Sequence, residues 1–161
     1  MRQFLRRLAV TALLAPVAAL GAATMTANPA AAAAKDQAIE TQVNKLINAE
    51  RAERGCGALK TNARITAAAR AHSAWMAQTG KFSHTGKAGS HFGTRIKNAG
   101  YAKPSAENIA WGYQTASAVV DGWMKSPGHR ANILNCKSKT VGVGIARATN
   151  GTPYYTQDFG F

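Results

Sequence analysis

The C-terminal stretch from Val141 to Phe161 reads VGVGIARATNGTPYYTQDFGF. Val141, Val143 and Ile145 alternate with glycines, which is the period of a strand with one apolar face. Residues 150–153, Asn-Gly-Thr-Pro, are typical of a turn, and an aromatic run follows them. The stretch therefore predicts a β-hairpin. Glycines on the face opposite the apolar side chains indicate that a helix or another backbone packs closely there.

Helical patterns precede this hairpin. Apolar residues recur at helical spacing from Ile39, and the segment stops at Gly55, which suits a C-terminal cap. Asn62 is a candidate N-cap for a second helix to Gly80, whose apolar face turns His72 inward. The other expected elements are a polar loop over 81–90 that carries His84, a short helix over 91–99, a strand over 109–113, and a helix that Thr115 caps and Pro127 and Gly128 end.

The N-terminus has the pattern of a Sec-type export signal. A basic segment with Arg2, Arg6 and Arg7 precedes an almost wholly apolar run, and the alanines of 30–34 are the small residues that a signal peptidase needs. A membrane anchor is the alternative, but the apolar run is short and interrupted by proline and glycine. We expect residues 1–34 to be cleaved and the protein to be secreted, with no stable membrane span.

The remaining residues, 35–161, are enough for one domain with its own core. Three of the 20 basic residues and none of the 7 acidic residues lie in 1–34, so the net charge falls only from +13 to +10. Such a charge favours anionic wall polymers or phospholipid headgroups outside the cell, although a merely solubilising surface is an equal alternative. No nucleic-acid motif is present. We expect a monomer that binds no nucleic acid.

Cys56 and Cys136 are the two cysteines of the chain. In an exported protein they predict one disulfide. Closing a loop of this length would stabilise the fold by about 4 to 5 kcal/mol on a chain-entropy argument.

Two imidazoles and one carboxylate occur in short loop-like segments, namely His84, Glu107 and His129. Together they would satisfy a divalent metal such as Zn²⁺ with one open position, or transfer a proton. The alternative is a purely structural role. In that case Glu107 accepts backbone hydrogen bonds from a neighbouring loop, and both histidines hold that loop in place by hydrogen bonds. The spacing lacks the short-range signature of a helical metalloprotease.

The order of motifs from Ala38 to Phe161 resembles the CAP superfamily, the cysteine-rich secretory, antigen 5 and pathogenesis-related-1 proteins, also called the SCP domain. The matching segments are 48–51 (Asn-Ala-Glu-Arg), 71–73, 76–77, 82–86 (Phe-Ser-His-Thr-Gly), 107–110 (Glu-Asn-Ile-Ala), 123–124, 126–134 (Ser-Pro-Gly-His-Arg-Ala-Asn-Ile-Leu), 141–144 and 155–160. The resemblance implies an α+β fold, a three-layer α-β-α sandwich with a central antiparallel sheet.

The resemblance also implies a cavity lined by two histidines and two glutamates that holds zinc or another divalent ion. His84, Glu107 and His129 match three of these positions, and Ser126 stands at the fourth. The missing carboxylate weakens any transfer of acid-base chemistry. His72, Ser126 and Asn108 are further candidates for the cavity wall, although a lone histidine on an apolar helix face is more often a core residue.

Two function classes follow from these observations. The first is a secreted, non-enzymatic binding module for a divalent metal, a lipid or a cell-surface ligand such as an anionic wall polymer, as the family resemblance implies. The second is a metal-dependent hydrolase or peptidase that uses His84, Glu107 and His129. The absent glutamate and the positive charge favour the binding module.

Overall fold

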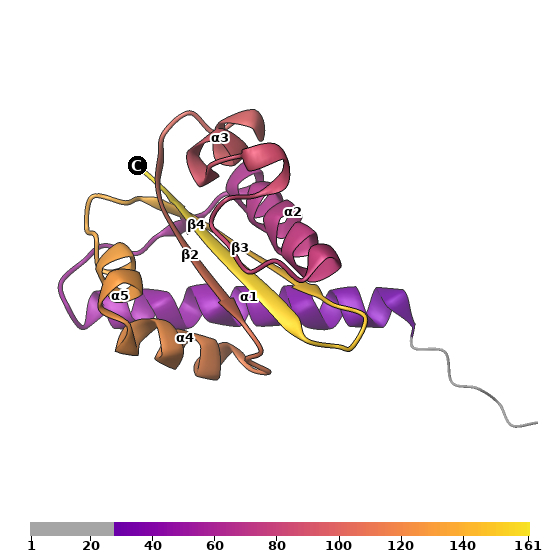
Figure 1. Ribbon diagram of the computed structural model, residues 1–161. Coiled ribbons are helices and arrows are strands. Elements are labelled where there is room, and N and C mark those ends of the chain that lie inside the picture. Colours follow the sequence, from indigo (N-terminus) through magenta and orange to yellow (C-terminus); the bar gives the residue numbers. More distant parts are fainter. Residues whose placement is uncertain (1–27) are drawn as a thin grey trace, which may run out of the picture.

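The computed structural model describes residues 28–161 and forms three layers (Figure 1). Two helices, α2 and α3, cover one face of a sheet, and α1, α4 and α5 cover the other. The elements in chain order are α1 (Pro29–Ala52), β1 (Lys60–Thr61), α2 (Ala63–Thr79), the 3-10 turn η1 (Lys87–Gly89), α3 (Phe92–Asn98), β2 (Pro104–Trp111), α4 (Ala116–Lys125), α5 (Pro127–Ile133), β3 (Thr140–Arg147) and β4 (Pro153–Gly160). The expected α+β sandwich is confirmed.

The sheet has the strand order β1-β3-β4-β2. Its three long strands pair antiparallel, and β3 and β4 form the hairpin predicted from the C-terminal sequence. The two-residue strand β1 pairs parallel with β3, so the sheet is mixed at that edge. At the other edge lies β2, and this position leaves one side of β2 free to take part in a site.

Glycines in β3 let α2 approach the sheet closely. A Cβ at Gly142 would lie 2.2 Å from the backbone nitrogen of Thr66, and a Cβ at Gly144 would lie 2.1 Å from that of Arg70. No other residue fits in that space. The expectation that a helix packs on the glycine face is confirmed, and this contact fixes where α2 places its polar side chains.

The main apolar core lies on the opposite face, between the sheet and helices α1 and α4. The alternating residues Val141, Val143 and Ile145 point into it. Trp123 of α4 is fully buried there and donates its indole N–H to the carbonyl oxygen of Ile109 at 3.2 Å. This bond holds α4 against β2.

Three element boundaries differ from the sequence-based expectations. The first helix begins at Pro29 rather than near Ile39, because Asn28 caps it and proline is favoured in a first turn. The strand around Glu107 begins at Pro104 rather than 109. Pro127, expected only to end a helix, opens α5, again as a first-turn proline.

The predicted signal falls mostly on residues 1–27, which lie outside the described residues; 30–34 form exposed turns of α1. Within residues 28–161 no helix is both long and apolar enough to cross a bilayer.

The predicted disulfide between Cys56 and Cys136 is confirmed. Beside it, the fully buried guanidinium of Arg51 donates to backbone carbonyl oxygens of two separate segments, with distances from 2.7 to 3.2 Å. The acceptors are Gly57, Ile133, Asn135 and Ser138. The disulfide and Arg51 thus tie the segment after α1 to the segment after α5.

Candidate functional site

Glu107 is buried in β2 and both of its carboxylate oxygens are occupied. His84 Nδ1–H donates to Oε1 at 2.8 Å, and the Arg95 guanidinium donates to Oε2. Burial alone would raise the pKa of Glu107, but the hydrogen bond from His84 and the charge of Arg95 outweigh it and lower the pKa. Glu107 is therefore an ionised carboxylate that links the 81–90 loop to α3.

Asn108, the next residue of β2, points to the opposite face of the sheet because side chains alternate along a strand. Its amide donates to the backbone oxygen of His129 at 3.2 Å and to Gln157 Oε1 at 3.0 Å, and it accepts from Asn132. Asn108 is fully buried and lines no cavity among those described. Its bonds to His129 and Asn132 hold α5 against β2.

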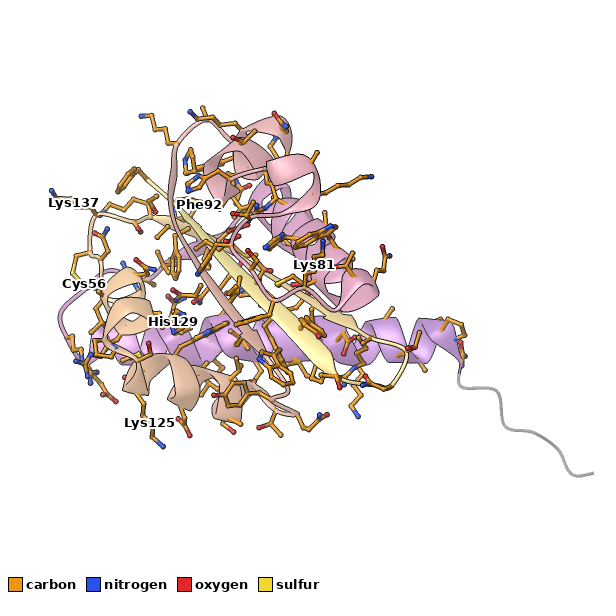
Figure 2. All side chains as sticks on the ribbon, in the orientation of Figure 1. Cys56, Lys81, Phe92, Lys125, His129 and Lys137 are labelled. Atoms are coloured by element: carbon orange, nitrogen blue, oxygen red, sulfur yellow. A yellow bond between two sulfur atoms is a disulfide. The ribbon has the colours of Figure 1, made fainter. Side chains whose placement is uncertain are left out.

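His129 lies in the first half of α5 (Figure 2), and Ser126 immediately precedes that helix. Burial lowers the pKa of the His129 imidazole, and the neighbouring charge of His84 lowers it further. The two rings are therefore within electrostatic range of each other. The imidazole of His129 stays neutral over a wider pH range than an ordinary histidine.

The predicted site residues line three separate cavities. His84 and Glu107 lie together in a cavity of 320 Å³, the Glu107 cavity, with Asn132. Ser126 and His129 line a separate cavity of 460 Å³ farther along β2, which also includes Phe82 and Ile109. His72 lines a third cavity of 460 Å³ between α2 and α3, called here the α2–α3 groove. The structure joins His84 to Glu107, and it places His129 on α5 in the neighbouring cavity along β2.

Aromatic side chains surround the cavity that Ser126 and His129 line. Phe82, Trp111 and Tyr113 line it, and they are three of the four exposed large apolar residues within 28–161. The rings of Phe82 and Trp111 lie 6.5 Å apart, and Trp111 is 55% exposed. We call this cavity the aromatic groove. Its combination of exposed rings with the hydroxyl groups of Ser126 and Tyr113 and one imidazole is typical of a ligand site.

The predicted metal ligands are His84, Glu107 and His129. Among the described residues no three or more His, Cys, Asp or Glu side chains are arranged to hold one. Glu107 has no free oxygen, but the bond to His84 Nδ1 leaves Nε2 of that ring available. A carboxylate that orients a histidine through its second nitrogen is the usual outer partner of a metal-binding imidazole. Within the described residues, His84 Nε2 is thus an imidazole nitrogen that Glu107 orients from behind.

His72 is 1% exposed, as the helical pattern predicts. Its Nε2–H donates to the backbone oxygen of Ser83 at 2.9 Å, and its ring lies parallel to that of Trp75 at 5.5 Å. Several effects act on the pKa of His72, and the largest of them, burial of the ring, lowers it. His72 is therefore a neutral imidazole with its proton on Nε2.

Asp158 is a buried acid that the sequence analysis does not single out. It is fully buried, and neither carboxyl oxygen has a hydrogen-bond partner among the described residues. Burial and the charge of Glu107 raise its pKa well above the usual value. The hairpin pattern could have predicted that Asp158 is buried. The face of β4 that α2 covers, next to the β3 glycines, carries Tyr154, Thr156 and Asp158.

A profile of the cysteine-rich secretory protein family (CAP) matches residues 45–159. The chain is 36% identical over 151 residues to the uncharacterised protein YkwD of Bacillus subtilis strain 168, which covers 92% of this chain and 56% of YkwD. It is 33% identical over 121 residues to the uncharacterised membrane protein YlbC of the same strain, which covers 74% of this chain and 34% of YlbC. The chain thus spans little more than half, or less, of these curated relatives.

Among solved structures, an extracellular SCP-domain protein from Bacillus anthracis strain Ames matches with a TM-score of 0.75 and 27% identity, over 83% of this chain and 43% of that one. An outer surface protein of Borrelia burgdorferi matches with a TM-score of 0.69 and 20% identity, over 78% of this chain and 92% of that one. The second likeness concerns the fold alone. With the profile match and the likeness to YkwD, these findings show that the chain belongs to the cysteine-rich secretory protein (CAP) family.

Proposed function

We propose that this chain is an exported, non-enzymatic binding module that takes an anionic cell-wall polysaccharide into the aromatic groove. The observation that carries the proposal is the gathering of three exposed aromatic rings around one cavity that also holds Ser126 and His129. Rigid aromatic side chains supply a large apolar contact at a small entropic cost. Sugar rings have flat C–H faces that suit such a surface, and their hydroxyl groups suit a serine and an imidazole.

Charge supports an anionic partner. The net charge of +10 outside residues 1–34 attracts polyanions over a Debye length of about 8 Å at physiological salt. Lys81 and Lys125 directly precede Phe82 and Ser126 of the groove, and Lys125 projects outward from the end of α4 (Figure 2). An anionic polymer held by its sugars in the groove would have cations beside it.

Export is part of the proposal. The basic and apolar pattern of residues 1–34 is that of a cleaved signal, followed by the domain of 35–161. A structural relative is described as extracellular, and the family is named for secretory proteins. A disulfide suits an oxidising compartment outside the cytosol.

A divalent metal ion is a second proposed ligand, and the His84–Glu107 bond favours it. His84 and His129 would hold the ion, and Glu107 would orient His84. A bound zinc ion supplies Lewis acidity to whatever occupies its open positions. Hydrolysis would also need a general base, and Glu107 is held by Arg95 and His84. Binding is therefore favoured over the alternative of a metal-dependent hydrolase.

The proposed function is tested by co-sedimentation of the exported protein with purified, insoluble cell-wall polymer. Trp111→Ala should lower the bound fraction at least tenfold, because it removes the most exposed ring of the aromatic groove. Phe161→Ala is the matched control, since Phe161 is 48% exposed but does not line the groove. Equal binding by both variants would show only non-specific attraction of charge. Binding to anionic lipid vesicles but not to wall polymer would point to a lipid partner.

A further inference from the structure

A polar cleft lies between α1 and α2, at the edge of the sheet that β1 and β3 form, and is called here the α1–α2 cleft. The aromatic groove lies at the opposite edge, beside β2. The cleft has a volume of 330 Å³, which falls within the range of about 300–1,000 Å³ for small-molecule sites. Among the described residues that line it, only Val143 is apolar. Such walls favour a ligand that is held mainly by hydrogen bonds.

Two buried polar atoms of cleft-lining residues have no hydrogen-bond partner within residues 28–161. They are Asn44 Oδ1 on α1 and Thr66 Oγ1 on α2. The amide nitrogen of Asn44 donates to Thr61 Oγ1 at 3.4 Å, so its oxygen is the acceptor that is left over. The Thr66 hydroxyl can both donate and accept. Buried groups of this kind are normally paired, so the cleft has places for a donor and for an acceptor of a ligand.

The α1–α2 cleft borders the open edge of β3. The short strand β1 pairs with β3 only at Thr140 and Val141, so within residues 28–161 no strand lies beside the rest of that edge. Farther along, the buried carboxylate of Glu40 accepts from the backbone N–H of Ile145 at 3.1 Å. Arg70 of α2 donates to the same carboxylate, so the ion pair joins the two helices across the edge. The cleft therefore has room for a compact molecule but not for an extended peptide that runs along β3.

The charges of the cleft favour a neutral ligand. Among the described residues that line it, Glu40 is the only carboxylate, and Arg70 already donates to both of its oxygens. Lys45 is exposed, so its ammonium group is hydrated and requires no partner. The polar atoms that require a partner are therefore those of Asn44 and Thr66. A neutral group with one donor and one acceptor satisfies both.

We propose that the α1–α2 cleft binds an N-acetylated sugar, and that the acetamido group of this sugar lies between Asn44 and Thr66. The amide N–H donates to Asn44 Oδ1, and the amide oxygen accepts from the Thr66 hydroxyl. The acetyl methyl group has Val143 as its apolar neighbour, and the ring hydroxyl groups face the threonine and amide side chains of the remaining wall. No residue of this cleft lines the aromatic groove or belongs to the predicted metal ligands. The site thus goes beyond the proposed function.

Water is the competing occupant of the cleft, because a water molecule also donates and accepts and needs about two to four polar partners. Water would satisfy Asn44 and Thr66, but a cleft that holds only water does not distinguish sugars with and without an acetamido group. A peptide is the other competitor, since its backbone amide offers the same N–H and C=O groups. The experiment must therefore separate the sugar from both.

The methyl β-glycosides of N-acetylglucosamine and of glucose are suitable probes, because they differ only in the acetamido group. Calorimetry on the whole exported protein should give about tenfold or more tighter binding of the acetamido sugar, since it alone makes both hydrogen bonds to buried groups. The side-chain amide signals of Asn44 in ¹H–¹⁵N spectra should shift on its addition. Equal affinity for the two glycosides, or no binding of either, would overturn the proposal. Equally tight binding of N-acetylalanine methylamide would overturn it in favour of a peptide.

Thr66→Val removes the hydroxyl but keeps the shape of the side chain, and it should weaken binding of the acetamido sugar about tenfold. Thr94→Val is the matched control, because Thr94 lies on α3 and does not line the cleft. Asn44→Leu removes the other partner and should have a similar effect, with melting temperatures to show that each variant folds. Undiminished binding in Thr66→Val and Asn44→Leu contradicts the proposal. Trp111→Ala should leave binding of this sugar unchanged, so a failure of this inference is distinguishable from a failure of the proposed function.

Discussion

Asp158 lies directly opposite Glu107 where β4 pairs with β2, and both side chains face the α2 layer. The two acids are in opposite states. Glu107 is ionised because His84 and Arg95 bind its oxygens, whereas Asp158 has no partner among the described residues and its pKa is raised well above the usual value. The charge of Glu107 helps to keep Asp158 protonated. The pair therefore carries one negative charge where two carboxyl groups meet.

Asp158→Asn should make the stability of the protein less dependent on pH. The raised pKa means that the folded state keeps a proton that the unfolded state releases above about pH 4. The wild type therefore loses stability as the pH rises from about 4 to the folded-state pKa, by about 1.4 kcal/mol per pH unit. Urea unfolding of both proteins should show the free energy of unfolding of the variant rising relative to that of the wild type as the pH increases above about 4. If the difference in free energy of unfolding between the two proteins did not change with pH, Asp158 would be ionised in the folded state.

Arg51→Lys should lower the free energy of unfolding by about 3 kcal/mol or more. Several buried carbonyl oxygens lose their donors, and a lysine cannot reach them all. Chemical unfolding gives the free energy. Arg54→Lys is the matched control, since Arg54 makes only exposed contacts, which are ion pairs with Glu50 and Glu53 and a hydrogen bond to the backbone oxygen of Glu50. Its loss of stability should stay below about 0.5 kcal/mol. Similar losses for both variants would argue against the role given to Arg51.

Gly144→Ala should destabilise the fold by about 3 kcal/mol or more. The new methyl group would meet the backbone of α2 at 2.1 Å from Arg70 N, and a backbone cannot move aside as a side chain does. Gly128→Ala in α5 is the control, because a Cβ there meets nothing within 4 Å and alanine favours a helix. A melting temperature of Gly144→Ala equal to that of the control would contradict the close packing of α2.

Zinc should bind in a one-to-one site, and His84→Ala or His129→Ala should remove most of the affinity. Glu107→Gln should weaken it only about 10- to 100-fold, because Glu107 orients His84 without touching the metal. Affinity should fall as the pH drops through the histidine range, since the ligands must be neutral. Calorimetry measures the zinc affinity in each case. Complete loss in Glu107→Gln would instead make Glu107 a direct ligand.

Much of the fold is accessible from local sequence signals. The alternation of valine and glycine predicts both the hairpin and the close approach of a helix. Asn62 predicts the start of α2, and the apolar face of that helix predicts the inward position of His72. The export pattern with two cysteines predicts the disulfide. These features depend on short-range periodicity, capping chemistry or a simple count. They do not depend on how distant segments pack.

The candidate site can be predicted only in part, because it depends on which face of a strand each residue takes. A strand predicted to begin at residue 109 leaves Glu107 and Asn108 outside it, so the faces that their side chains take are not predicted. In the structure both lie in β2 and their side chains point to opposite layers. A helix that ends at Pro127 places His129 in a loop, whereas the structure has it on α5. Arg95 belongs to no motif that the sequence analysis identifies. In the structure it donates a hydrogen bond to the Glu107 carboxylate and lines the α2–α3 groove.

The three tryptophans of the chain provide the most direct test of the proposed function. Trp111 and Trp123 line the aromatic groove and Trp75 lines the α2–α3 groove, so their indole N–H signals report on the two sites separately. Titration with a soluble anionic wall polysaccharide, followed by ¹H–¹⁵N spectra, should shift the signal of the exposed Trp111 strongly and leave that of Trp75 in place. An unmoved Trp111 signal at saturating polymer would contradict the proposal that the aromatic groove binds it.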